Sequence, residues 1–533
     1  MYRYIPASTP VLTPPLLLQI ADVQVGTACV WAWYPWSEPL SLRWQVKGAV
    51  DLNAQQQVVM PQQSAGTGWT STYYLSNLPP ASEVQVTVCQ AGCSEGESTV
   101  FSTPGNFEQA LSFGWGGDVC GQGYGRHAVY GLPIFDVLAR QSFDFFILCG
   151  DLIYADHALP ALRYSPMSAY PAAWPNRLDN PLADWAGLPA PTDVASTVDA
   201  FRSRYLYLFA DTGFRRFVQD TPMVYVLDDH EIYNNFTRET SLIGDCRYPL
   251  STIFSDLQRC GLQAWREFAP SGPAQTEPNA APAPVAPGFK YIRRGPLLDL
   301  FVVDARTQRS ANSCNRQTQY GPDCHWLGPA QLAALRTALK NSNALWKVLV
   351  SGSPLSILIP DSDASTNGDG QTVWDGVSNG DDGPPTGREI ELSMLLSGLK
   401  EDGVENLVVL SGDVHFASAT YYCPQAAAFK DFMPFWEFTN GPLHAGGFPT
   451  KGVDGTFGAT QVFTYASPHA STPPGPLCTS FGTAHIDLLF FGSISASFAQ
   501  KRKLLLILIF SPGNHVKLNL TDSKEAPCKD EFF

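Results

Sequence analysis

Acidic residues and histidines follow five long apolar runs of the chain, at the point where each run ends. The run ends lie at Asp118, at Asp151, at Asp228 to His230, at Asp304, and at Asp413 with His415. Carboxylates that are packed together repel one another and lose their solvation, so they need cations between them. If the fold brings these ends together, the residue types indicate a site for more than one metal ion.

Buried parallel strands are the elements that would bring the five ends together. Continuous apolar runs such as FDFFILCGD are typical of strands that are covered on both faces. Stretches with helical spacing lie between the runs, at residues 194–219, 327–341 and 387–401, and this alternation predicts an α/β core. In open α/β sheets, ligands bind beyond the carboxyl ends of the strands. We therefore expect the acidic ends at one edge of one sheet.

The first part of the chain has a different pattern. Segments of alternating hydrophobicity, such as LSLRWQVKG and SEVQVTVCQ, are separated by turns rich in Pro, Gly and Ser, which is typical of antiparallel strands. We predict a small all-β domain of the immunoglobulin-like sandwich type at residues 1–105. A large α/β domain is predicted at residues 106–533, with FSTPGNFEQ as the connection.

Composition limits the classes of partner. The 533 residues carry a net charge of −15, which argues against a nucleic-acid-binding surface, and no basic patch offsets it. The apolar stretch 504–510 is too short to cross a bilayer, so no transmembrane segment is predicted. The beginning of the chain does not read as a signal peptide, but export by a missed signal leaves the localisation open. Cys89–Cys93 and Cys314–Cys324 are close enough in sequence to form disulfides.

The segment GDLIYAD places Asp151 and Tyr154 three residues apart, just after a predicted strand. An aspartate can bridge two cations, and we expect Asp151 to do so. A tyrosine ligand must lose a proton with a pKa near 10, and ferric iron makes that loss easiest. A strand-end turn with a packed tyrosine would also account for this segment.

The segments DDHE and GDVH supply further candidate ligands. We expect Asp229 to reach a metal, His230 to face the substrate, and Glu231 to orient His230. In GDVH, Asp413 and His415 alternate along an extended segment and therefore share a face. A helix N-cap with an acidic first turn is the alternative interpretation of DDHE. A lone GDVH is structural about as often as it is functional.

Taken in order, these motifs resemble those of the PhoD-like alkaline phosphatases, a family of the metallophosphoesterase superfamily, over about residues 106–460. The phrases that carry the resemblance include GDVCGQGYG, GDLIYAD, LDDHEIYNNF and SGDVHFASATYY. The resemblance implies a four-layer αββα sandwich. It also implies hydrolysis of phosphate monoesters or diesters by Fe3+ with Ca2+ or another divalent cation. His230 matches the residue that steadies the transferring phosphoryl group, and the matched metal-binding positions are Asp118, Asp151, Tyr154, Asp229, Asp413 and His415.

The ligand set departs from the family pattern at a few positions. Asp118 stands where some relatives have a cysteine, with Cys120 close by as an alternative ligand. The set is rich in oxygen and poor in imidazole, which suits calcium, magnesium or ferric iron better than zinc. Arg306 and Asn235 are candidates for substrate contacts, although a structural role suits them equally. Asp304 is expected to be a hydrogen-bond partner at a strand end rather than a ligand.

The expected reaction is the attack of a metal-bound hydroxide on phosphorus, with the cations and His230 offsetting the charge that develops. The expected partner is a small phosphate-ester substrate. Two other functions stay open. One is a phosphodiesterase or phospholipase that acts on larger esters. The other is a catalytically weak binding or scaffold protein that retains the phosphatase fold.

Overall fold

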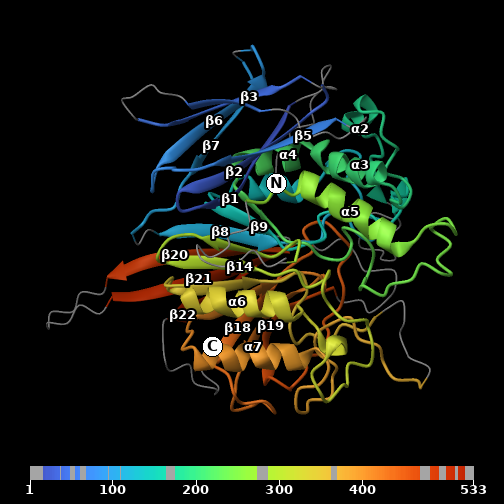
Figure 1. The fold of residues 1–533 in the computed structure, drawn as a ribbon, viewed down its shortest axis with the longest axis vertical. Coiled ribbons are helices and arrows are strands. Elements are labelled where there is room, and N and C mark those ends of the chain that lie inside the picture. The colour runs from blue at the N-terminus through green and yellow to red at the C-terminus, as the bar shows by residue number, and fades with distance from the viewer. Residues whose placement is uncertain are drawn as a thin grey trace.

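The fold was obtained as a computed structural model. It describes residues 16–36, 38–48, 55–59, 68–93, 95–107, 110–163, 174–272, 286–361, 369–467, 480–490, 500–510 and 514–521. Within these ranges the chain has a mixed α/β fold with two large sheets and two smaller ones, of four and two strands (Figure 1). The predicted α/β class is confirmed.

The larger sheet has nine strands in the order β22-β21-β20-β8-β9-β12-β1-β2-β5. Its centre is parallel: β8 (Leu111–Gly116) pairs with β9 (Phe145–Leu148), and β9 pairs with β12 (Met223–Tyr225). The other strands are β1 (Leu17–Gln24), β2 (Thr27–Tyr34), β5 (Trp69–Leu75), β20 (Ser480–Phe490), β21 (Gln500–Phe510) and β22 (Asn514–Thr521). The parallel centre carries the acidic run ends at Asp118, Asp151 and Asp229.

The second sheet has seven strands in the order β13-β14-β15-β16-β18-β17-β19. Its parallel strands are β14 (Leu298–Val302), β15 (Trp346–Val350), β16 (Leu407–Ser411) and β18 (Phe435–Thr439). The antiparallel strands are β13 (Lys290–Arg293), β17 (Ala417–Tyr422) and β19 (Ala459–Tyr465). Asp413 and His415 follow β16, so they come from this second sheet.

Alternation along the strands explains how the two sheets pack. Phe145 and Ile147 of β9 lie in a cluster with Val348 and Val350 of β15, so this core lies between the sheets. Phe146 faces the other way, toward the helices. Because successive strand residues point to opposite faces, a strand with apolar residues at every position is buried on both sides.

Helices cover the outer face of each large sheet (Figure 1). On the nine-stranded sheet these are α1 (Pro133–Leu138), α3 (Val198–Phe209), α4 (Thr212–Asp220) and α5 (Phe254–Phe268). On the seven-stranded sheet they are α6 (Pro329–Asn341) and α7 (Glu389–Glu401), which confirm two predicted helices. The stretch of helical spacing at 194–219 contains two helices, because Asp211 separates them and caps the second: its side chain accepts from the Phe214 amide at 2.9 Å. Shorter elements are β10 (Leu162–Arg163), β11 (Trp174–Pro175), α2 (Pro181–Trp185) and the 3-10 turn η1 (Pro322–Cys324).

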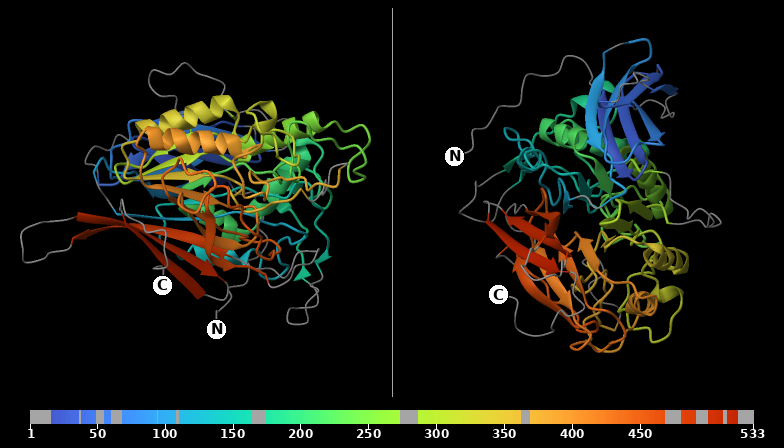
Figure 2. Two further views of the ribbon diagram at one scale, coloured as in Figure 1. Left: turned by 90° about the horizontal axis from the view of Figure 1, so that it is seen from below. Right: turned by 90° about the vertical axis from the view of Figure 1, so that its left-hand side faces the viewer.

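The N-terminal strands lie at one end of the molecule, and the segment with α6 and α7 lies at the other (Figure 2). A four-stranded sheet is formed by β4 (Gln55–Val59), β3 (Leu40–Val46), β6 (Glu83–Gln90) and β7 (Glu97–Ser102). It shares a core with β1, β2 and β5, in which Leu42 and Val86 meet Ile20 and Val30. β1 also pairs in parallel with β12, so the N-terminal strands extend the nine-stranded sheet. The immunoglobulin-like form and the boundary at 105/106 stay predictions.

Two further predictions are settled by the described residues. Cys89, Cys93, Cys314 and Cys324 are all free thiols, so both predicted disulfides are wrong. The Sγ of Cys89 instead donates to the carbonyl of Cys93 at 3.1 Å. Within the described ranges, none of the helices combines the length and the apolar character that a bilayer span requires.

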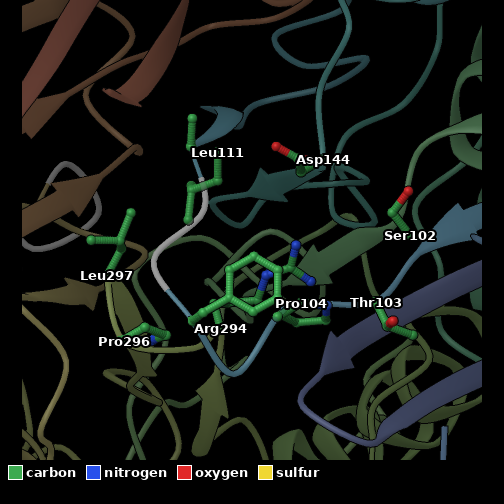
Figure 3. Close-up of a pocket in the computed structure, with 11 residues that line it drawn as sticks. Ser102, Thr103, Pro104, Leu111, Asp144, Arg294, Pro296 and Leu297 are labelled. Carbon is green, nitrogen blue, oxygen red and sulfur yellow. The ribbon is translucent and has the colours of Figure 1, made fainter. Parts of the chain in front are cut away.

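A hollow lies where the N-terminal strands meet the two large sheets (Figure 3). Its lining includes Thr103, Leu111, Asp144 and Arg294. Leu111 begins β8 and Asp144 directly precedes β9, whereas the acidic residues follow the far ends of these strands. The hollow is therefore separate from the cluster described next.

Candidate metal centre

The acidic ends of the strands meet where the carboxyl ends of the two large sheets adjoin. The loop after β18 joins them, because the amides of Leu443 and His444 donate to the carbonyls of Gly117 and Asp118 at 2.8 and 2.9 Å. The prediction of one sheet edge is wrong in this respect: three ligand segments come from the nine-stranded sheet and one from the seven-stranded sheet. Strand periodicity reports burial, but it does not report sheet membership.

The repeated Gly-Asp pairs have a steric reason. The backbone φ angles of Asp118, Asp151 and Asp413 are 65°, 51° and 70°, a left-handed conformation that costs a non-glycine residue about 1–3 kcal/mol. The preceding glycines let the loops approach closely. A Cβ on Gly150 would lie 2.4 Å from the Cβ of Asp228, and one on Gly412 would lie 2.9 Å from the Cys149 carbonyl oxygen. Such strain persists where the surrounding structure fixes it, which is common at functional sites.

Asp118, Tyr154 and His415 form one half of the cluster. The Tyr154 hydroxyl lies 2.6 Å from His415 Nε2 and 3.4 Å from Asp118 Oδ1, and His415 Nε2 lies 3.2 Å from the same oxygen. His415 Nδ1 is 2.5 Å from the Gly446 carbonyl oxygen. A donated bond from Nδ1–H fixes the tautomer that leaves the Nε2 lone pair directed at Asp118 and Tyr154. This half offers one nitrogen and two oxygens.

Asp151, Asp229 and Asp413 form the other half. Ligand atoms of Asp118, Asp151 and His415 lie within 4.8 Å of one another, and so do those of Asp151, Asp229 and His230. A third such group contains Asp228, Asp229 and Asp413. Asp151 belongs to two of the groups and connects the halves.

Buried carboxylate oxygens without a hydrogen bond mark this cluster, and those of Asp229 and Asp413 have only long contacts with Arg306, at 3.5 and 3.8 Å. Among the described residues, one buried oxygen of each of Asp118, Asp151, Asp229 and Asp413 accepts no hydrogen bond. A buried carboxylate oxygen without a partner is costly, and buried charges are normally paired or bound to metals. The four side chains therefore offer oxygen atoms that can bind cations, and their buried charges are stabilised when cations are bound.

Electrostatics agree with this conclusion. Burial, followed by the charges of Asp229 and Asp228, raises the pKa of Asp151 well above its usual range. Burial also raises the pKa of Asp413 to about 6, although Arg306 opposes the shift. Without a cation, these carboxyl groups therefore favour the protonated, neutral form. A bound cation would reverse that preference.

His230 is oriented by a residue that sequence reasoning missed. Its Nδ1 lies 2.7 Å from Oδ1 of Asp156, whose other oxygen accepts from the Asn234 amide at 2.9 Å. Burial lowers the pKa of His230, but the charges of Asp156 and Asp229 outweigh it and raise that pKa to about 9. Asp156 is the last residue of GDLIYAD. Its position two residues after Tyr154 was the sequence signal that could have indicated a role at the site.

The prediction that Glu231 orients His230 is wrong. Both oxygens of Glu231 accept backbone amides: Oε1 from Leu152 at 2.6 Å, and Oε2 from Asp228 at 2.9 Å and Asp151 at 3.2 Å. Adjacent side chains point in different directions, so the Glu231 carboxylate does not reach the His230 ring. It instead holds together the two loops that carry Asp151 and Asp229.

Arg306 and Asn235 lie beside the cluster in different ways. The guanidinium of Arg306 is fully buried, and its Nη2 is 3.5 Å from Asp229 Oδ1 and 3.8 Å from Asp413 Oδ2. The Asn235 amide donates to Asp229 Oδ2 at 2.6 Å, while its side chain donates to Asp361 at 3.0 Å. Both therefore contact a ligand carboxylate directly.

Asp304 is a hydrogen-bond partner, as predicted. It accepts from the amides of Gly288, Arg306 and Thr307. Cys120 lies outside the groups of metal-ligand atoms found among the described residues. Burial raises the pKa of its thiol, which disfavours a thiolate ligand.

Comparison with known proteins identifies the class of this fold. A solved structure described as "Structure of PhoD" matches with a TM-score of 0.60 at 14% identity, over 97% of this chain and 94% of that chain. At this identity the likeness shows the fold. A glycosyl hydrolase family 2 member from Bacteroides cellulosilyticus aligns over 96% of this chain and 79% of that chain at 9% identity, but its TM-score is only 0.21. No curated protein matches the sequence at a significant level.

The sequence itself decides the family. The model of the PhoD-like phosphatases matches residues 113–482. The chain belongs to the PhoD-like phosphatase family. Membership points to metal-dependent hydrolysis of phosphoesters, and the cluster supplies residues that could hold the metal.

Proposed function

We propose that this protein hydrolyses phosphate esters at a site for two metal cations, held by Asp118, Asp151, Tyr154, Asp229, Asp413 and His415. The observation that supports this most strongly is the set of four ligand carboxylates, each with a buried oxygen that accepts no hydrogen bond among the described residues. Asp151 is the proposed bridge, since it belongs to one ligand group with Asp118 and His415 and to another with Asp229. The helices that cover both large sheets support the four-layer αββα arrangement as part of this proposal.

The donor set fits hard cations. It contains oxygen atoms from four carboxylates and one phenol, and a single imidazole nitrogen from His415. Burial and the neighbouring carboxylates raise the pKa of Tyr154 well above its usual range, so a phenolate there requires a strongly Lewis-acidic ion. We propose Fe3+ beside Asp118, Tyr154 and His415, with Ca2+ or another divalent cation on the other side. When bound, such cations lower the pKa of water and offset phosphate charge.

His230 supplies a positive charge that can contact the substrate. Its Nδ1 is held by Asp156, so its Nε2 is the atom left to contact a phosphoryl oxygen. With a raised pKa, the imidazolium donates a charge-assisted hydrogen bond to a group that gains negative charge in the transition state. The fixed bond to Asp156 means that little reorganisation is needed when the substrate reacts. Arg306 acts on the carboxylates rather than on the substrate, because its guanidinium is fully buried among them.

Metal content and two simple esters test this proposal. The protein should contain metal by mass spectrometry and turn over p-nitrophenyl phosphate, its bis ester, or both. Asp151→Asn should lose metal and turnover together, whereas the exposed Asp256→Asn on α5 should change neither. Stoichiometric metal without turnover of either ester favours the binding or scaffold alternative. Near-normal activity of Asp151→Asn would refute the mechanism.

The ferric assignment has its own test. A Tyr154 phenolate on Fe3+ should give a visible charge-transfer band, and Tyr154→Phe should remove it. A fully active, metal-loaded and colourless protein contradicts ferric iron. A phospholipase or phosphodiesterase that acts on larger esters stays an alternative. Turnover of such esters is to be measured on the wild type and on Asp151→Asn and Tyr154→Phe.

A further inference from the structure

A lysine lies beside the proposed metal centre on the loop between β18 and β19. The loop is fixed by its backbone: the Phe448 amide donates to the His415 carbonyl at 3.1 Å, and the Leu358 amide donates to the Gly452 carbonyl at 2.9 Å. Lys451 lies between these two anchors. Its position relative to His415 is therefore set by main-chain hydrogen bonds.

The ammonium group of Lys451 lies over the Phe448 ring, and that ring packs beside His415. Its Nζ is 5.9 Å from the centroid of the Phe448 ring, and that ring is 4.8 Å from the ring of His415. The side chain is partly buried, and its charge interacts with those of Asp413 and Asp375. Burial lowers the pKa of Lys451, while these two carboxylates raise it.

Lys451 differs from Arg306, the other cation beside Asp413. Arg306 is fully buried, and its guanidinium contacts Asp228, Asp375 and Ser353. Among the described residues, the ammonium of Lys451 makes no hydrogen bond and no ion pair within 4.0 Å. Asp413, whose charge acts on Lys451, has a side chain that is 14% exposed. Lys451 is therefore a partly desolvated cation near Asp413, on the less enclosed side of the site, whose ammonium makes no close ion pair with a described carboxylate.

We propose that Lys451 binds a non-bridging oxygen of the substrate phosphate and makes phosphate monoesters the preferred substrate class. This inference rests on the proposed phosphatase function. A monoester carries about −1.5 to −2 charges near neutral pH, whereas a diester carries one. Because the attraction scales with substrate charge, a fixed cation beyond the metal ligands favours the monoester. A second ester group on phosphorus would also replace one of the charged oxygens available to the ammonium.

Three variants of the full-length, metal-loaded protein test this role. Lys451→Met removes the charge and keeps the length, Lys451→Arg restores a charge, and Lys400→Met removes an exposed lysine that pairs with Asp431 on the protein surface. The measurements are kcat and KM for p-nitrophenyl phosphate and its bis ester, inhibition by inorganic phosphate, and metal content.

We expect Lys451→Met to lower kcat/KM for the monoester by roughly 10- to 100-fold, the size of a lost hydrogen bond to a charged group. The diester should lose about threefold or less, and phosphate should inhibit correspondingly more weakly. Lys451→Arg should recover most of the monoester activity, and metal content should match the wild type in all variants. Lys400→Met should behave as the wild type.

Three results would overturn the inference: equal losses on both esters, unchanged phosphate inhibition, or loss of metal from Lys451→Met. These results are distinct from a failure of the proposed function. If the wild-type protein holds metal but hydrolyses neither ester, the phosphatase proposal fails, and the role of Lys451 fails with it. If the wild type is active and its preference survives Lys451→Met, only the role of Lys451 fails.

Discussion

Replacement of Arg306 by methionine should destabilise the protein more than any exposed charge replacement. Arg306 is fully buried and donates to Asp228, to Asp375 at 2.9 Å and to Ser353 at 2.8 Å. Asp375 would keep Arg309 as a partner. Asp228 would keep only a long contact of 3.5 Å with the Ser353 hydroxyl. The variant therefore leaves one buried carboxylate almost without compensation.

The magnitude follows from that uncompensated charge. Removing one partner of a buried ion pair costs about 3–5 kcal/mol, because the other charge stays desolvated. Burial raises the pKa of Asp228 well above its usual range, and the charge of Arg306 acts against this shift. Arg306→Met should therefore lower the free energy of unfolding by about 3–5 kcal/mol. Asp228→Asn in the same chain should recover roughly 1–3 kcal/mol of that loss.

Urea unfolding followed by tryptophan fluorescence measures both numbers in a double-mutant cycle. Arg336→Met is the matched control, since Arg336 is 39% exposed and pairs with Asp402 and Glu401 at the surface. It should cost less than about 1 kcal/mol. An Arg306→Met protein within about 1 kcal/mol of the wild type would contradict the reasoning. So would a double variant that recovers nothing.

Three other changes should have measurable effects. Asp156→Asn removes the charged acceptor of His230, and we expect kcat to fall roughly 10- to 100-fold at unchanged metal content; an effect confined to KM would count against this role. Gly150→Ala places a Cβ 2.4 Å from Asp228 at a φ of +89°, so we expect a lower Tm and weaker metal retention, and a wild-type thermal scan would argue against the steric account. Burial raises the pKa of Glu389 to about 9, so the folded state keeps a proton that the unfolded state releases near pH 4.5. Stability should therefore fall as pH rises between these values. As pH rises through this range, the free energy of unfolding of Glu389→Gln should increase relative to that of the wild type by up to about 1.4 kcal/mol per pH unit. A difference that does not depend on pH would exclude the raised pKa of Glu389.

The sequence by itself determined the ligand segments and the elements that carry them. Apolar runs before Asp118, Asp151 and Asp413 form buried strands, because a strand covered on both faces must be apolar at every position. The helices α6 and α7 also follow from local periodicity. Such features depend on neighbours along the chain, so local patterns are enough to find them.

Only the tertiary structure decided how these segments meet. Asp413 and His415 come from a different sheet than Asp118, and strand periodicity does not record which sheet a strand joins. The partner of His230 is Asp156, 74 residues away, while the adjacent Glu231 binds backbone amides. Arg306 looked available to substrate in sequence, yet it is enclosed by carboxylates from three separate segments. Side-chain direction and burial arise from long-range packing, and for this reason the roles of these residues could not be read from their order in the chain.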